Sequence, residues 1–204
     1  MSAITISRQM GSQGDELALH VAQQLGWRLV QRNLINQAAL AADVPHMALA
    51  DIDELGLLNL HPSAKEWQAY QNQVESIIRY WADKGESVIV GRGGQMALRG
   101  RPEVFHIRVV APFEMRVAQL QQEENISAES AGARLEASAK TRARYLRRSY
   151  GVQLDDPTLY HLSINTGLLG LPQAVNLVIQ TIQAWIEADG INERGVLRSE
   201  SQRE

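Results

Sequence analysis

The chain of 204 residues is long enough for one domain with a sizeable core, and its 45% hydrophobic and 21% charged content is ordinary for a globular protein. A net charge of −3 gives no general case for a nucleic-acid or membrane partner. The absence of cysteine excludes disulfides and thiolate metal sites. No secretory signal pattern and no apolar run of ~18 residues is seen, so we expect a cytoplasmic protein.

The first predicted elements are a short buried strand and an amphipathic helix. Residues 3–7 form a β-branched run that is typical of a strand. Apolar residues recur at helical spacing from Leu17 to Leu25, and Gly26 follows as a stop signal. Residues 8–14, RQMGSQG, therefore form a glycine-containing turn between a strand and a helix.

Helices and apolar strands then alternate along the chain. The periodicity predicts helices at 34–42, 64–84, 112–124, 127–150 and 173–189, and strands at 28–30, 87–90, 104–110 and 162–166. Ser63 is the expected N-cap of the long helix, whose Trp67, Tyr70 and Trp81 indicate either core packing or a homodimer face. Residues 167–172 are predicted to be a loop.

This alternation predicts an α/β fold with a mostly parallel sheet and helices on both faces. We expect a single domain over residues 1–190 and a disordered polar tail over 191–204. The carboxyl ends of parallel strands meet at one edge of the sheet, so function is expected there. Three turns fall at that edge: residues 8–14, residues 91–94 and the end of the strand at 162–166.

The opening turn has the plan of a phosphate-binding loop. Gly11 and Gly14 would let the backbone approach a phosphate, and the following helix dipole favours an anion. A full P-loop, G-x-x-x-x-G-K-[ST], also supplies a lysine and a hydroxyl. Here Arg8 stands at the first glycine, Gly14 at the lysine and Asp15 at the hydroxyl. The spacing alone is equally compatible with an ordinary helix start that carries a first-turn acid.

Three stretches together resemble the cytidylate kinase-like family. They are ISRQMGSQG with GWRLVQRNLI, VIVGRGGQMALRGRPEVFHIRVVAP, and the run from TRARYLRRSYG through DDPTLYHLSINTGLLG. The order and spacing match over roughly residues 3–185. The resemblance implies a three-layer P-loop NTPase fold with a nucleoside-monophosphate-binding insert (about 33–84) and an arginine-rich helical lid (about 125–160). It also implies ATP and Mg²⁺ as cofactors and γ-phosphoryl transfer to CMP or dCMP.

The same resemblance assigns arginines to the phosphates. Arg92 is expected to bind the acceptor phosphate as a catalytic residue. Gly91 and Gly93 are expected to be substrate-binding residues that leave room for this approach. The lid would lay its arginines over the phosphates during closure, with Arg144 and Arg148 expected to be catalytic and Arg142 expected to point elsewhere. A solvated basic face or a nucleic-acid patch remains an alternative reading, although the negative net charge disfavours nucleic acid.

Residues of two further stretches are expected to contact the acceptor nucleotide. Arg32 matches a basic position of the family motif, and Asn165 lies where related kinases hold base or sugar groups. Asn165 can equally belong to a simple strand-end turn. The resemblance assigns the remaining contacts to ATP, and these cofactor-binding residues are Arg8, Gly11, Ser12, Gln13, Gly14, Asp15 and Glu16.

Two departures from the family pattern concern charge. The family usually has G-S-G-G-R-E where this chain has GSQGDE, so Asp15 replaces an arginine, and Gln31 replaces an aspartate. Asp15 would help to hold Mg²⁺, which prefers carboxylate oxygen, or it marks a site that no longer transfers phosphoryl groups. In the second case the chain would bind nucleotide without turnover or serve as a scaffold for protein partners.

Other site types find little support in the sequence. The five histidines form no i, i+4 metal-binding pair and no HExxH, which disfavours a zinc hydrolase. Gly11 and Gly14 give only G-x-x-G after the first strand, so a nicotinamide site remains a remote alternative. His106 lies within a strand and is expected to be a packed or surface residue rather than a catalyst.

Overall fold

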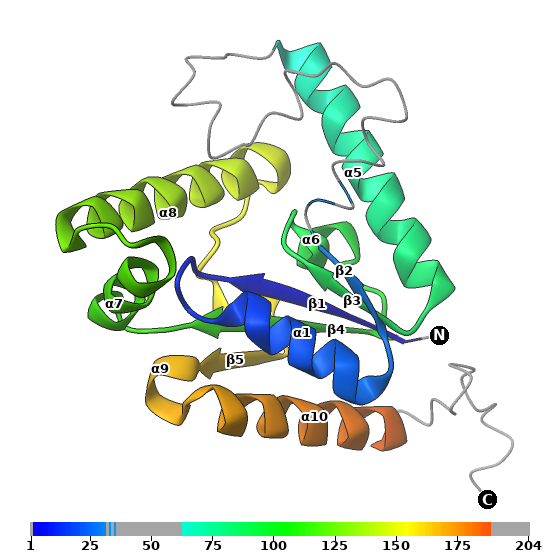
Figure 1. The fold of residues 1–204 in the computed structure, drawn as a ribbon. Helices are drawn as coiled ribbons and strands as arrows, with labels where there is room; N and C mark the ends of the chain where they lie inside the picture. Colours follow the sequence, from blue (N-terminus) through cyan, green and yellow to red (C-terminus); the bar gives the residue numbers. More distant parts are fainter. Residues whose placement is uncertain (1, 32, 34, 36–62, 189–204) are drawn as a thin grey trace, which may run out of the picture.

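A five-stranded parallel sheet with helices on both faces forms the centre of the molecule (Figure 1). The computed structural model describes residues 2–31, 33, 35 and 63–188. The strand order is β2-β3-β1-β4-β5. The strands are β1 (Ala3–Arg8), β2 (Arg28–Val30), β3 (Ser87–Val90), β4 (Val104–Val110) and β5 (Leu162–Asn165). The predicted α/β class with helices on both faces of a parallel sheet is therefore confirmed.

The helices follow the predicted alternation. They are α1 (Gly14–Leu25), α5 (Ala64–Lys84), α6 (Gly94–Ala97), α7 (Phe113–Glu124), α8 (Ala128–Tyr150), α9 (Thr166–Leu169) and α10 (Leu171–Ala188), with a 3₁₀ turn η1 (Pro157–Leu159). None of the helices in the described ranges is long and apolar enough to cross a membrane.

Alternation along β1 divides its side chains between two environments. Ile4 and Ile6 are fully buried in a core shared with α1 and α10. Ala3 belongs to the opposite core, which includes residues of α5 and α8. Thr5 and Ser7 point to the same side as Ala3, because strand residues alternate between the faces. This second side therefore carries polar groups toward the carboxyl end of the strand.

The long helix α5 starts as predicted. Ser63 accepts a hydrogen bond from the Glu66 backbone, and the Glu66 carboxylate accepts one from the Ser63 backbone in return, which forms a capping box. Tyr70 is fully buried, and Trp67 and Trp81 pack against the same core. The core interpretation of this aromatic face is thus confirmed, although a dimer face is not tested by it.

Several boundaries differ from the sequence predictions. The helix α10 begins at Leu171 rather than at residue 173, within the stretch that was expected to be a loop. The first helix begins at Gly14 rather than Leu17, because its first turn is formed by a glycine and two acids that carry no apolar signal. Residues 166–169, expected to be loop apart from Thr166, form the short helix α9, whose first turn is capped by Asn165. The predictions for residues 36–62 and for the tail at 191–204 lie outside the described residues.

Candidate active site

The opening turn is built as a tight loop that ends in a helix without a side-chain cap. Gly11 has φ +73° and Gln13, the N-cap of α1, has φ +54°. The Ser12 hydroxyl donates to the Gln9 carbonyl at 2.8 Å, which closes the loop on itself. The Gln13 side chain makes no capping bond, so within the described structure the first-turn N–H groups of α1 have no side-chain acceptor there. Such a helix start is suited to a phosphate.

Gly14 is required by space rather than by backbone conformation. A Cβ added at this position would lie 2.5 Å from Arg8 Cβ and 2.9 Å from Arg8 Cγ. Residue 14 is where a P-loop carries its lysine, so the stem of Arg8 occupies the place from which that lysine side chain would start. Arg8 therefore provides the positive charge of this loop from the opposite side of the turn.

Asp15 is paired with that same arginine. Arg8 Nε donates to Asp15 Oδ1 at 3.0 Å, while the side chain of Asp15 remains 53% exposed. The carboxylate is thus partly neutralised at the entrance of the loop. Glu16 lies beside it in the first turn of α1, where acidic residues are stabilised by the helix dipole.

The second predicted turn contacts the first. Gly91 has φ +77°, and a Cβ added to it would lie 3.0 Å from Arg8 Nη1. Arg92 follows in a left-handed conformation at φ +51°, which is uncommon for a residue with a side chain and fixes its direction. The end of β3 therefore places Gly91 against the guanidinium of Arg8, and Arg92 lines the same cavity as Arg8.

The third predicted turn, at the end of β5, is hydrogen-bonded to the opening loop. The Thr166 hydroxyl donates to the Ser12 carbonyl at 2.7 Å, which joins the end of β5 to the loop. Asn165 Oδ1 accepts from the backbone N–H groups of Gly167 and Leu168 at 3.0 and 3.3 Å. Asn165 is therefore a helix cap in this structure, and contact with a base or sugar remains a prediction.

The arginine-rich helix α8 lies over both turns. Arg142 Nη1 donates to the Arg8 carbonyl at 2.7 Å, and the Tyr145 hydroxyl donates to the Arg92 carbonyl at 3.3 Å. A Cβ on Gly93 would lie 2.8 Å from Tyr150 Cε2, so glycine is needed there for the helix to approach. Burial raises the pKa of Tyr145, which keeps its hydroxyl protonated as a donor.

Arg108 is a site residue that the sequence analysis missed. It lies on β4, is 4% exposed, and donates to Ser7 Oγ at 2.8 Å and to Asp155 Oδ1 at 2.9 Å. A strand arginine flanked by valine and isoleucine carries no motif signal. Arg108 pairs in register with Ser7 of the adjacent parallel strand, so the two side chains lie on the same face of the sheet. This pairing, which indicates that Arg108 belongs to the site, is visible only in the structure.

These segments enclose one cavity of about 70 Å³ at the carboxyl ends of the strands. Its charged lining consists of Arg8, Arg92, Arg108 and Arg142, contributed by β1, the β3–α6 turn, β4 and α8. Two carboxylates, Asp15 and Asp155, pair with members of this group. All the charged side chains among the described residues that line this cavity are guanidinium groups, so this lining favours anions.

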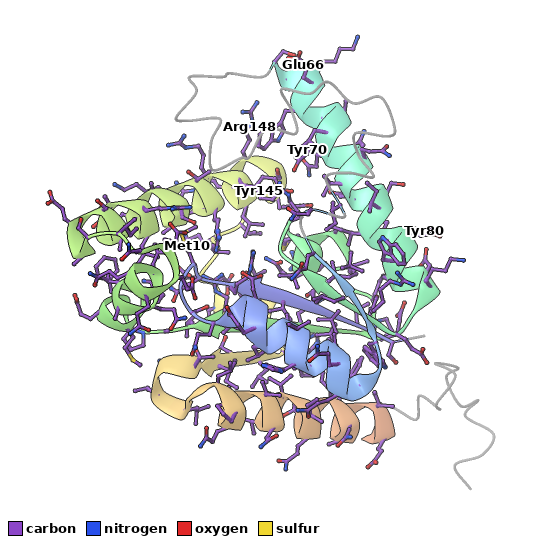
Figure 2. All side chains as sticks on the ribbon, in the orientation of Figure 1. Met10, Glu66, Tyr70, Tyr80, Tyr145 and Arg148 are labelled. Carbon is purple, nitrogen blue, oxygen red and sulfur yellow. The ribbon has the colours of Figure 1, made fainter. Side chains whose placement is uncertain are left out.

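The structure separates Arg142 from the two lid arginines expected to be catalytic. Arg144 and Arg148 are exposed, and among the described residues it is Arg142 that lines the cavity. Figure 2 shows Arg148 at the end of α8 nearest α5, with Tyr70 and Tyr145 between these helices, and the Arg148 guanidinium lies 4.2 Å from the Trp67 ring centroid. The roles of Arg144 and Arg148 remain predictions that require α8 to move.

A neighbouring hollow extends from the loop toward the expected acceptor region. It is lined by Arg8, Asp15, Gln31 and Asn33. Arg32, the predicted acceptor contact, lies outside the described residues. The described part of the chain holds no cluster of three or more His, Cys, Asp or Glu side chains that could bind a metal by itself.

The donor set is nevertheless compatible with magnesium nucleotide. Mg²⁺ is usually bound by one or two carboxylates together with substrate phosphates and water, and Asp15 offers one exposed carboxylate at the loop entrance. The start of α1, where no side chain caps the first-turn N–H groups, fits phosphate oxygens. The residues present therefore fit ATP and Mg²⁺ without an all-protein metal cage.

The model of the cytidylate kinase-like family matches residues 3–168. The chain belongs to this family. It is also 25% identical over 178 residues to a cytidylate kinase of Natronomonas pharaonis, an alignment that covers 87% of each chain.

Solved structures share the architecture. An uncharacterized protein from Eubacterium ventriosum has a TM-score of 0.73 at 20% identity, covering 90% of this chain and 99% of that chain. The shikimate kinase of Acinetobacter baumannii has a TM-score of 0.52 at 12% identity, covering 90% and 94%. These likenesses concern the fold, which is the α/β P-loop fold expected from the sequence.

Proposed function

We propose that this protein transfers the γ-phosphoryl group of ATP to a pyrimidine nucleoside monophosphate, CMP or dCMP. The observation that carries the proposal is the convergence of Arg8, Arg92, Arg108 and Arg142 on one cavity at the carboxyl ends of the strands. Membership of the cytidylate kinase-like family and the likeness to a cytidylate kinase support the choice of substrates.

Each group has a role that follows from its position. The opening loop and the start of α1 would bind the phosphates of ATP through backbone N–H groups, with Arg8 in place of the usual lysine. Arg92 would hold the acceptor phosphate, and Arg108, fixed by Ser7 and Asp155, would orient it. Arg142 would stabilise the charge that develops on the transferred group.

In the proposed reaction an oxygen of the acceptor phosphate attacks the γ-phosphorus. The bond from this phosphorus to the β–γ bridging oxygen breaks, and ADP and a nucleoside diphosphate are released. Mg²⁺ bound with ATP, next to Asp15, would neutralise phosphate charge. The arginines position the two nucleotides and exclude water, since phosphoryl transfer depends mainly on positioning and electrostatic stabilisation.

The approach of the lid implies motion during turnover. The cavity of about 70 Å³ is much smaller than the ~300 Å³ that small-molecule sites usually offer. Arg142 also donates to the Arg8 carbonyl across the entrance. We propose that α8 withdraws to admit the nucleotides and returns to place Arg142 on the phosphates, as lids do in other kinases.

The test is Mg²⁺-dependent transfer from ATP to CMP, dCMP, UMP, AMP and GMP by the purified protein. We expect transfer to CMP or dCMP, a loss of at least tenfold in Arg92→Ala, and no change in Arg79→Ala, which alters an exposed α5 residue paired with Glu75. If folded protein binds ATP but transfers phosphoryl groups to none of these acceptors, the proposed kinase activity is refuted. That result would favour the nucleotide-binding alternative, whereas no ATP binding would favour the scaffold.

A further inference from the structure

A second cavity lies behind the arginine cavity on the same face of the sheet. Its volume is about 310 Å³, at the lower end of the ~300–1,000 Å³ range of small-molecule sites. It opens beside β4 at His106, two residues before Arg108, which lines the first cavity. The turn after α6 forms one wall, and η1 with the residues that follow it forms the other.

The floor of this second cavity is a buried histidine. His106 is 6% exposed, and its Nδ1 lies 2.8 Å from Thr5 Oγ1. Within the described residues no hydrogen-bond partner is present for its Nε2. Burial, followed by the neighbouring His161, lowers the pKa of His106 to about 4, so the ring is neutral at pH 7. A ring nitrogen of a residue that lines the cavity is therefore available to a ligand.

The rim of the second cavity supplies positive charge. Arg99 and Arg101 both line it. Arg101 is held by Asp83 at 2.8 Å and by Glu103 at 2.6 Å. Within the part of the chain that the structure describes, Arg99 interacts electrostatically with Asp156, whose Oδ1 already accepts from the backbone N–H and the hydroxyl of Thr158. Arg99 is therefore the cation of this rim that is least committed to an ion pair.

We propose that this second cavity binds a small metabolite through a carboxylate or phosphate group, with Arg99 as the charged contact and His106 Nε2 as a hydrogen-bonding partner. The proposal does not depend on phosphoryl transfer. The chain is expected to bind the metabolite whether or not the first cavity is catalytic.

Gln95 and Tyr160 connect the two cavities. Gln95 lines both and is 4% exposed, and its Nε2 donates to the Tyr160 hydroxyl at 3.4 Å. Tyr160 lines the second cavity, and the Arg108 guanidinium lies 5.9 Å from its ring centroid. A ligand that displaced Tyr160 would disturb the ring that faces Arg108, so we expect binding in the second cavity to change the affinity of the first.

The direct test uses histidine-labelled protein and ring ¹H–¹⁵N NMR, titrated with inorganic phosphate in one arm and with malonate in the other. We expect saturable shifts of His106 and His161 and none of His20, which is exposed on α1. A response to malonate alone identifies a carboxylate ligand, and a response to phosphate alone a phosphate ligand. Unchanged His106 signals in both arms would overturn the proposal.

Substitution of the exposed Arg99 separates this site from general anion binding. We expect Arg99→Gln to weaken the probe at least fivefold, and Arg79→Gln, a matched loss of a surface arginine, to leave it unchanged. Equal affinity in Arg99→Gln and wild type would refute Arg99 as the contact. Coupling is measured by ATP titration with and without the effective probe: at least a twofold change in Kd is expected in wild type and none in Arg99→Gln. An unaltered wild-type Kd would exclude the coupling.

Discussion

At the scale of single residues, the ion pair of Asp15 changes the meaning of an acid in a phosphate loop. Arg8 Nε and Asp15 Oδ1 are 3.0 Å apart, and the Asp15 side chain is more than half exposed. Exposed pairs of this kind contribute about 0–1 kcal/mol to folding. The pair is therefore better understood as a control on the charge available to phosphate than as a stabilising contact.

We predict that Asp15→Asn tightens binding of ATP when Mg²⁺ is absent. Removing a carboxylate ~4 Å from a phosphate charge relieves a repulsion of about 1 to 4 kcal/mol, depending on the local dielectric. If Asp15 also binds Mg²⁺, the same variant loses the stimulation of ATP binding by the metal. Calorimetric titration of ATP with and without Mg²⁺ measures both effects.

Glu16→Gln is the control for this substitution, because it removes an acid from the same helix turn without breaking the pair with Arg8. A smaller effect on ATP affinity is expected for Glu16→Gln. Identical affinities of Asp15→Asn and wild type under both metal conditions would show that Asp15 lies outside the phosphate field.

His106 predicts a measurable pH dependence of stability. The pKa of His106 is lowered from 6.5 to about 4 in the folded protein. Between these two pH values the histidine is therefore protonated in the unfolded chain and neutral in the folded chain. The unfolding free energy is thus unaffected by this residue above pH 6.5 and falls as the pH drops toward 4. A shift of this size corresponds to about 3 kcal/mol when complete.

Denaturant unfolding of wild type and His106→Gln at pH 4, 5, 6 and 7 tests this contribution. The loss of stability on acidification should be smaller in His106→Gln by up to about 3 kcal/mol, while His20→Gln should behave as wild type does. Parallel pH curves for wild type and His106→Gln would mean that the buried ring does not resist protonation.

At the scale of elements, α8 determines which arginine reaches the site. The helix is docked by Arg142 on the Arg8 carbonyl, by Tyr145 on the Arg92 carbonyl and by Tyr150 against Gly93. These three residues lie on one side of the helix, whereas Arg144 and Arg148 are exposed. A rigid lid in this position would place Arg142 alone of the three arginines at the phosphates.

We therefore predict that Arg142→Ala lowers kcat of phosphoryl transfer on the order of 10²-fold, as loss of a transition-state charge contact does. Arg142→Lys should recover only part of the rate, since a lysine lacks the planar fork of donors. Steady-state kinetics measure kcat of both variants. Arg134→Ala is the control, because Arg134 lies elsewhere on α8 and pairs with Glu124 of α7, and it should retain wild-type kcat. A full rate in Arg142→Ala would return the assignment to Arg144 and Arg148.

Most elements could be predicted because their signals are local. The apolar strands at 87–90 and 104–110, and the helix that Ser63 caps, were predicted with bounds that match the structure. The start of α1 was not, because Gly14, Asp15 and Glu16 have no apolar residue to mark a helix face. The short α9 was missed since its cap, Asn165, is equally common in turns.

The candidate site was predicted less completely than the fold. The three turns at the strand ends follow from the parallel sheet, and they do meet. Arg108 could not be recognised, because its role depends on a register with Ser7 across 101 positions of sequence. Arg142 was expected to point away from the phosphates. Helix periodicity shows which residues share a face of α8, but it does not show which face packs against the sheet. Three-dimensional packing decides both.

At the scale of the whole molecule, the two faces of the sheet have different roles. One face forms a continuous apolar core with α1 and α10. The other has an apolar part under α5 and a polar strip at Thr5, Ser7, His106 and Arg108, beside which both cavities lie. Both proposed ligand sites therefore lie on the less apolar face, and their occupancy should stabilise the fold as a unit.

We predict that ATP at 100 times its Kd raises the unfolding free energy by about 2.7 kcal/mol, because it binds the folded state alone. For a chain of this length the corresponding rise in Tm is about 5–10 °C. Thermal unfolding with ATP, with and without Mg²⁺, measures it independently of turnover. An unchanged Tm at millimolar ATP would exclude nucleotide binding and leave the scaffold role.

The contact between Gly14 and the stem of Arg8 has a consequence for any attempt to rebuild this loop as a common P-loop. Neither the usual glycine at position 8 nor the usual lysine at position 14 can be restored alone: the lysine collides with Arg8, and the glycine leaves the loop without a cation. The complete P-loop pattern would further require Gln13→Gly and a hydroxyl residue in place of Asp15. Arg8 and Gly14 are thus coupled by space, so that a side chain at position 14 is tolerated only when the arginine at position 8 is shortened as well.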